Sequence, residues 1–210
     1  VPGTGQSYSA NVVGYDRTHD VAIIQLKNAS GLKTVNLGDS AKIGVGQAVV
    51  GLGNAGGVGG TPSTAVGQIT ALNQSITAQD ESNGTSERLT GLIQTDANIQ
   101  PGDSGGALIN SSGEVIGMDT AASTGFSFQT QGNQGFAIPI NSAMAVANQI
   151  RAGKASSSIH IGPTAFLGVE VDTSSSAANT QGATISGTIA SGPAAAAGIG
   201  NADVITSLGG

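Results

Sequence analysis

The sequence predicts an all-β protein. Glycine accounts for 34 of the 210 residues, a content typical of barrels and sandwiches with tight turns and close backbone contacts. Short segments rich in Val and Ile recur between Gly, Asn and Ser residues, as antiparallel strands do. Hydrophobic residues make up 38% of the chain, which favours a folded core over disorder. We therefore expect an antiparallel barrel or sandwich.

The strands follow one another along the first three quarters of the chain. "YSANVVGY" and "DVAIIQL" predict strands at 8–15 and 20–26, joined by the polar turn "DRTH". Long loops are expected at 53–64 and 77–90. Further β-branched segments predict strands at 46–54, 65–73, 91–96, 105–109, 113–120 and 135–140.

One helix follows Pro139. Asn141 or Ser142 is the expected N-cap, and Gly153 ends the helix. Its apolar face, at helical spacing, consists of Ala143, Val146, Ala147 and Ile150. We expect a linker at 154–164 and then a small second unit at 165–210. That unit combines strands at 165–171, 183–190 and 203–208 with a short alanine helix opened by Pro193.

Composition excludes several classes of function. The net charge of −6 offers no basic surface for nucleic acid, and no apolar run approaches the length of a membrane span. The chain has no cysteine, so it needs no particular redox compartment. No His, Cys or Asp cluster has metal-ligand spacing. The glycine-rich stretch 53–60 lacks the Lys of a phosphate-binding loop. We expect no cofactor and no metal.

The stretch "PGDSGG", 101–106, is suited to a nucleophilic serine. Such a serine needs exposure on a tight turn, a nearby base and donors for the developing oxyanion. Gly102 and Gly105 allow an unusual backbone, and the N–H groups of Gly102 and Ser104 can converge on one point. An ordinary glycine-rich hairpin turn with a surface serine would have the same sequence.

Asp20 is the candidate acid. In "DVAIIQL" it alternates with Ala22, Ile24 and Leu26, which places a carboxylate on an apolar strand face. That is costly without a partner, although a turn Asp at a strand start explains the pattern too. We expect structural roles for Asp39 and Asp96 in turns, and for Asp103 as an exposed turn residue.

These segments, in order over nearly all of 8–153, resemble the trypsin-like proteases of the HtrA (Deg) family, and within it a group of secreted mycobacterial enzymes. The resemblance rests on "YDRTHDVAIIQL", "LGDSAKIGVGQAVVGLGNAGG", "IQTDANIQPGDSGGALINSSGEVIGMDTA" and "GFAIPI". It implies a trypsin-like double β-barrel over 1–153 with a C-terminal helix, an N-terminal barrel that lacks strands, and a partial PDZ domain at 165–210. It also implies a secreted or cell-envelope location.

The resemblance assigns site residues. Asp20 would be the triad acid, Ser104 the nucleophile, and the N–H groups of Gly102 and Ser104 the oxyanion hole. Ile99 would line a pocket for small or medium aliphatic side chains. The walls of a cleft that binds peptide as an added strand would be Ile116, Gly117, Met118, Gly135, Phe136 and Ala137. The loop that binds C-terminal carboxylates in a complete PDZ domain would be Phe166, Leu167, Gly168 and Val169.

The family's triad histidine has no counterpart upstream of Asp20. His19 points to the opposite strand face from Asp20 if both lie in a strand, and His160 falls in the expected linker. We therefore expect a chain cut at both ends, inactive as it stands, prone to association through exposed strand edges. Its complete form would cleave exposed polypeptide segments. The alternatives are a pseudoprotease that binds peptides and a structural β-protein with a coincidental "GDSGG".

Overall fold

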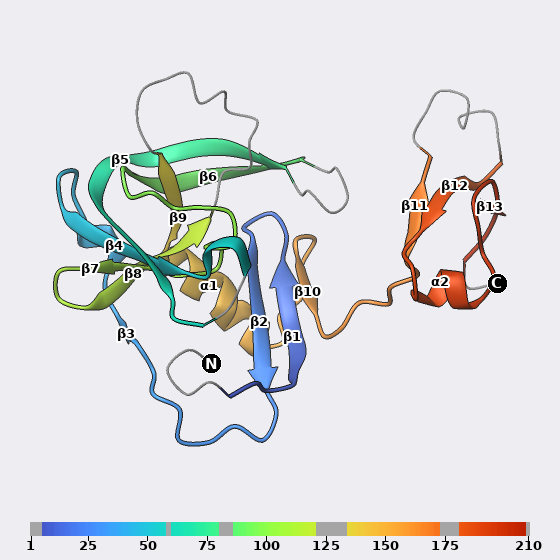
Figure 1. Ribbon diagram of the computed structural model, residues 1–210, viewed down its shortest axis with the longest axis horizontal. Coiled ribbons are helices and arrows are strands. Elements are labelled where there is room, and N and C mark those ends of the chain that lie inside the picture. The colour runs from blue at the N-terminus through green and yellow to red at the C-terminus, as the bar shows by residue number, and fades with distance from the viewer. Residues whose placement is uncertain (1–5, 58–59, 80–85, 121–133, 173–180, 209–210) are drawn as a thin grey trace. The chain divides into compact units, whose positions relative to one another are not determined.

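A computed structural model describes residues 6–57, 60–79, 86–120, 134–172 and 181–208 (Figure 1). The chain forms two compact units, Val1–Pro163 and Thr164–Gly210. The loops expected at 53–64 and 77–90 lie partly outside the described residues, as do residues 173–180 of the second unit. Among the described helices, none has the length and apolar character needed to cross a bilayer.

Most of the first unit is a closed antiparallel barrel. Its strands occur in the order β8-β7-β4-β5-β6-β9, and β9 pairs again with β8, which closes the ring. A short strand, β3 (Asn36–Leu37), lies parallel to β8 on the outside of this ring. The barrel strands are β4 (Ala48–Gly53), β5 (Ser63–Gln79), β6 (Ser86–Thr95), β7 (Ala107–Asn110), β8 (Glu114–Thr120) and β9 (Gly135–Pro139).

The strands form because their apolar residues alternate, so that one face of each fills the barrel. The loop expected at 77–90 is shorter than predicted, because β5 continues to Gln79 and β6 begins at Ser86. The barrel interior consists of Val49, Ile69, Ile93, Leu108, Ile116 and Ala137, all at most 2% exposed.

A three-stranded antiparallel sheet completes the first unit, in the order β10 (Ile159–Ile161), β1 (Ala10–Asp16), β2 (Val21–Leu26). Gly14 permits its tight packing, because a Cβ there would lie 2.5 Å from the His160 carbonyl oxygen. The expectation of a linker at 154–164 is therefore wrong for 159–161, which pair with β1.

The helix α1 (Ile140–Arg151) packs against this sheet and against β8 and β9 of the barrel. Its N-cap is Pro139, earlier in the chain than predicted. Asn141 does not cap the helix, because its side-chain amide donates to Asp39 Oδ1 at 2.8 Å. The buried residues Ala143, Val146 and Ile150 of the predicted apolar face join a second core cluster.

The second unit has its own small sheet, β11 (Val169–Val171), β12 (Ala183–Thr188) and β13 (Val204–Ile205). The helix α2 (Pro193–Ala196) closes against the segment before β11, since the Ala194 N–H donates to the Leu167 carbonyl at 2.9 Å. Ile185 and Ala194 are fully buried here.

Candidate active site

The loop 101–106 between β6 and β7 carries Ser104, which is exposed. Its backbone lies tightly against the segment after β4. Gly102 has φ +96, and a Cβ there would lie 2.6 Å from the Asn54 carbonyl oxygen. The Gly56 N–H donates to the Pro101 carbonyl at 2.9 Å. Only glycine fits this position, so the turn geometry that "PGDSGG" predicts is present.

The expectation that Asp103, next to Ser104, is an exposed turn residue is wrong. It is 4% exposed. Its Oδ2 accepts from the Gln100 N–H at 2.9 Å, and its Oδ1 accepts from the Ser63 hydroxyl. The carboxylate is buried because the loop folds back onto the end of β4, where Asp103 occupies the space that a side chain at Gly53 would take. Asp103 therefore anchors the loop to the barrel.

The end of β8 connects the serine loop to Asp20. The Gly105 N–H donates to the Asp119 carbonyl at 2.8 Å, and the Asp119 N–H donates to the Gly106 carbonyl at 2.8 Å. One residue further, the Thr120 hydroxyl donates to Asp20 Oδ2 at 3.5 Å. Segments far apart in the sequence thus meet at one point.

Asp20 itself lies in the turn between β1 and β2, with φ 53, and it is exposed. The expectation that it alternates within a strand is wrong, because β2 begins only at Val21. The turn is closed by the Asp20 N–H, which donates to the Arg17 carbonyl at 3.2 Å. Its approach to Thr120 agrees with a role at the site, but its function as triad acid stays a prediction.

Both histidines are engaged elsewhere. His19 lies in the same turn, and its Nδ1 lies 2.8 Å from Asp16 Oδ2. His160 lies in β10, where its ring stacks on Tyr15 with centroids 5.1 Å apart. The sequence did not single out Asp16, which is 2% exposed. A polar residue at the end of an apolar strand was its only signal.

The N–H groups of the serine loop differ in their partners. The N–H groups of Asp103, Gly105 and Gly106 donate to carbonyls of the loop or of β8. Within the described part of the chain, no backbone carbonyl accepts from the Gly102 N–H. This agrees with the prediction that Gly102 contributes to an oxyanion hole, which remains untested.

Ile99 is half-buried between two strands. Its side chain occupies the space beside Gly51 and Gly135, where a Cβ on Gly135 would lie 2.5 Å from Ile99 Cγ1. A Cβ on Gly51 would contact both Ile99 Cδ1 and, at 3.3 Å, Asp119 Oδ2. These glycines therefore make room for Ile99 and bring it close to a buried carboxyl group.

That carboxyl group, Asp119, was not predicted. It is 1% exposed, and no described residue donates a well-formed hydrogen bond to either oxygen. The pKa of Asp119 is raised to about 7, mainly by burial and also by the charge of Asp103, while the nearby backbone N–H of Leu52 lowers it in part. The sequence signal for a buried carboxyl group at this position was an acidic residue inside the apolar run "VIGMDT".

The predicted cleft walls lie mainly in the core. Ile116, Phe136 and Ala137 are at most 8% exposed, and Gly117 and Gly135 are buried as well. Met118 is partly buried and packs against the core cluster to which α1 contributes. The strands β8 and β9 pair with each other and with β7 and β6, so both edges of each are occupied. Contact of these residues with a peptide stays a prediction.

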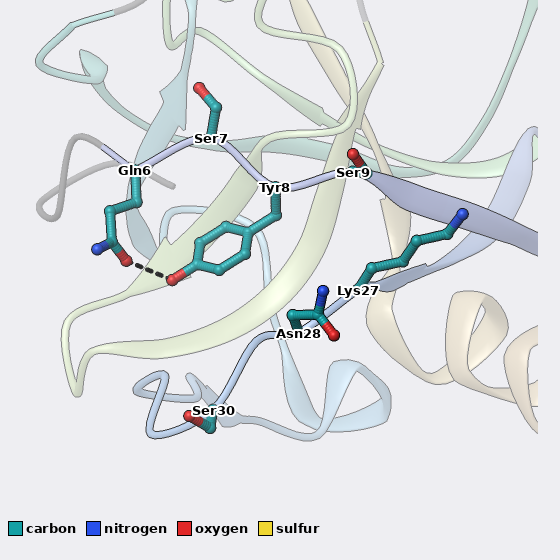
Figure 2. Close-up of a pocket in the computed structure, with 7 residues that line it drawn as sticks. All are labelled: Gln6, Ser7, Tyr8, Ser9, Lys27, Asn28 and Ser30. Atoms are coloured by element: carbon teal, nitrogen blue, oxygen red, sulfur yellow. Dashed lines mark hydrogen bonds between the residues drawn. The ribbon is translucent and has the colours of Figure 1, made fainter.

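A hollow of about 620 Å³ lies at the other end of the β1–β2 hairpin from Asp20. Figure 2 shows its polar lining and the hydrogen bond from the Tyr8 hydroxyl to Gln6 Oε1. None of the predicted site residues contributes to it. The lining consists of Gln6, Ser7, Tyr8, Ser9, Lys27, Asn28 and Ser30.

In the second unit, the predicted carboxylate loop precedes β11. Gly168 has φ +77 and its carbonyl accepts from the Ile189 N–H at 2.9 Å. Phe166 is 62% exposed, whereas Leu167 is half-buried and Val169 begins β11. Binding of a peptide terminus at this loop stays a prediction.

Comparison with known proteins identifies the family. A family model described as trypsin-like peptidase domain matches residues 1–118. Serine protease PepD of Mycobacterium tuberculosis is 36% identical over 97% of this chain and 42% of its own length. Periplasmic serine endoprotease DegP of Escherichia coli is 34% identical over 98% of this chain and 41% of its own length. The chain thus spans about two fifths of these relatives.

A solved structure is similar over nearly the whole chain. The HtrA-type protease AlgW with a decapeptide is 31% identical, with a TM-score of 0.58 over 98% of this chain and 60% of that chain. The resemblance predicted from the sequence is confirmed, and so is the trypsin-like all-β fold. The chain belongs to the trypsin-like peptidase family, and its relatives include serine proteases of the HtrA type.

Proposed function

We propose that the complete protein is a serine endopeptidase of the HtrA type that cleaves exposed or unfolded polypeptide segments. One observation carries this proposal: the end of β8 is bonded both to the loop of Ser104 and to Asp20. Gly105 donates to the Asp119 carbonyl at 2.8 Å, and Thr120 donates to Asp20 at 3.5 Å. These contacts support the proposal, because Ser104 and Asp20 lie on separate elements and a triad needs its nucleophile and its acid near one another.

The chemistry is acyl transfer. Ser104 Oγ attacks the scissile carbonyl carbon, and its proton passes to a histidine that this chain does not supply. The Gly102 N–H, with the N–H of Ser104, stabilises the oxyanion, and the amine leaves with the proton from the histidine. Water then hydrolyses the acyl ester, which restores the hydroxyl of Ser104. Asp20 orients the histidine and stabilises its charged form. No cofactor or metal takes part.

Ile99 supports a preference for small or medium aliphatic residues at the position before the cleaved bond. Its half-buried side chain lies beside Gly51 and Gly135, five residues before Ser104. A branched aliphatic side chain there offers an apolar contact and limits the space for a large one. The AlgW structure holds a decapeptide, so a protein of similar fold has been observed with a peptide.

The remaining assignments rest on the relatives. The names of the DegP proteins call them periplasmic, which supports an extracytoplasmic location. The second unit, with its exposed Phe166 before β11, would bind C-terminal peptides as part of a complete PDZ domain. Association into homo-oligomers is compatible with the free edge of β2, which pairs only with β1 among the described strands.

A second function is favoured by the placement of the two histidines. His19 is bonded to Asp16 and His160 stacks on Tyr15. If the complete protein supplies no other histidine at the site, it is a pseudoprotease that binds peptides. Loss of the base alone removes most of the rate.

Labelling with a fluorophosphonate probe decides between the two functions. We expect the complete protein to be labelled, Ser104→Ala to abolish labelling, and Ser112→Ala to leave it intact, since Ser112 is an exposed serine in the β7–β8 turn. Absence of labelling in a folded sample would overturn the endopeptidase and leave the peptide-binding protein.

A further inference from the structure

The turn that carries Asp20 is held by a buried carboxylate, Asp16, which is 2% exposed. Its Oδ1 accepts from the backbone N–H of His19 at 3.2 Å, and its Oδ2 accepts from His19 Nδ1 at 2.8 Å. The Ser158 hydroxyl adds a third hydrogen bond at 3.1 Å. An ionised carboxylate accepts several hydrogen bonds, so these donors compensate for its burial.

The same bonds connect the turn to the body of the first unit. Ser158 directly precedes β10 and lies 142 residues after Asp16 in the chain. In the sheet, Asp16 pairs with Val21 on one side and with Ile159 on the other. Asp16 therefore lies where β1 is paired with both β2 and β10, and its carboxylate holds the turn in place through hydrogen bonds.

A further contact supports the turn from its other end. The guanidinium of Arg17 lies 5.5 Å from the centre of the Tyr15 ring, at cation–π distance. Tyr15 in turn stacks on His160 of β10. The first and third residues of the turn, Arg17 and His19, are thus each tied back to β1, and the acid Asp20 follows them.

Asp20 needs this support. It is exposed and has φ 53, a left-handed conformation that residues other than glycine seldom adopt and that costs free energy to maintain. The hydrogen bond that its side chain accepts from Thr120 is 3.5 Å long, at the limit for such a bond. A turn that relaxed would move the carboxyl group of Asp20 away from Thr120.

We propose that Asp16 is a positioning residue for Asp20, acting through His19 and the turn. This inference rests on the proposed function, in which Asp20 orients the catalytic histidine. The predicted substrate contacts and Ser104 are on other elements, so a change at Asp16 should lower kcat and spare KM. An acid near the histidine raises its pKa. Displacing Asp20 should therefore lower the pKa of the base and move the acidic limb of the kcat/KM profile to lower pH.

The test uses the complete protein and Asp16→Asn, which keeps the shape but replaces one acceptor oxygen by an amide. Asp39→Asn is the matched control, since Asp39 is an acid of the same unit bonded to Asn141, away from the turn. Rates are normalised to the serines that a fluorophosphonate titrates, which removes unfolded molecules. We expect kcat to fall at least about tenfold, a modest part of what loss of a triad member costs, with KM unchanged. The acidic limb should shift to lower pH.

If Asp16→Asn does not fold, Ser158→Ala replaces it, because this variant removes one of three bonds and should show the same changes at smaller size. An unchanged kcat per titrated site and an unchanged acidic limb would overturn the inference alone, as would a loss confined to the number of titrated sites. A wild-type protein that neither hydrolyses peptides nor reacts with the probe would overturn the proposed function, and the inference with it.

Discussion

The buried carboxyl group of Asp119 predicts that the barrel loses stability as the pH rises. Its pKa is raised from 3.8 to about 7 by burial and by the charge of Asp103. A raised pKa means that the folded chain holds the proton longer than the unfolded chain. The stability that protonated Asp119 contributes is thus fully present below pH 4, decreases as the pH rises, and reaches its minimum above pH 7. At about 1.4 kcal/mol per unit, the total loss is about 4 kcal/mol.

Asp119→Asn removes this titration and leaves a side chain of the same shape. The free energy of unfolding of the variant minus that of wild type should be about 2–3 kcal/mol larger at pH 8 than at pH 5. Most of the stability that wild type loses is lost between these two pH values. Any cost of the amide that does not depend on pH cancels in this difference. Hydrogen exchange of the β4 and β8 amides measures the stability of the barrel separately from that of the second unit. An equal effect of the substitution at both pH values would show that Asp119 does not have a raised pKa in the folded chain.

Two further predictions concern the serine loop and the surface. Gly102→Ala should lower kcat of the complete protein by about 100-fold or more, the cost of losing an oxyanion donor, because its Cβ would lie 2.6 Å from the Asn54 carbonyl. Gly105→Ala is the control, because at φ +83 with open space around its Cβ it brings backbone strain without a clash. It should lose clearly less of the rate, and equal losses would contradict the clash. Asp39 has a pKa lowered to about 2 by the Asn141 amide, the Ala41 N–H and Lys42. The stability that ionised Asp39 contributes should be present above pH 4 and disappear as the pH falls towards 2. The free energies of unfolding of Asp39→Asn and wild type should therefore differ above pH 4 and converge towards pH 2. A difference that stays constant over this range would contradict the assignment.

The sequence could predict what depends on local pattern. The barrel strands follow from β-branched segments bounded by turn residues, and Gly102 follows from "PGDSGG" because only glycine tolerates that backbone. The family resemblance was also readable, because the segments that carry it occur in order along the chain.

The errors concern residues whose environment is made by distant segments. Asp103 was expected on the surface, yet Ser63 and Gln100 satisfy it in the interior. Asp20 was placed in a strand, but the turn before Val21 extends one residue further because the Asp20 N–H closes it onto Arg17. The strand at 159–161 is too short for a periodic pattern, and its pairing with β1 is a contact across the whole unit. Asp16 and Asp119 needed the tertiary structure to reveal their burial.

A crystal structure of the complete protein after reaction with a fluorophosphonate tests the proposed catalytic site most directly. We predict a phosphonyl group on Ser104 Oγ, with its oxygen accepting from the Gly102 N–H, and a histidine between Ser104 and Asp20. A phosphonyl oxygen that points away from Gly102, or an Asp20 side chain separated from the histidine, would contradict the claim that the end of β8 assembles a single catalytic site.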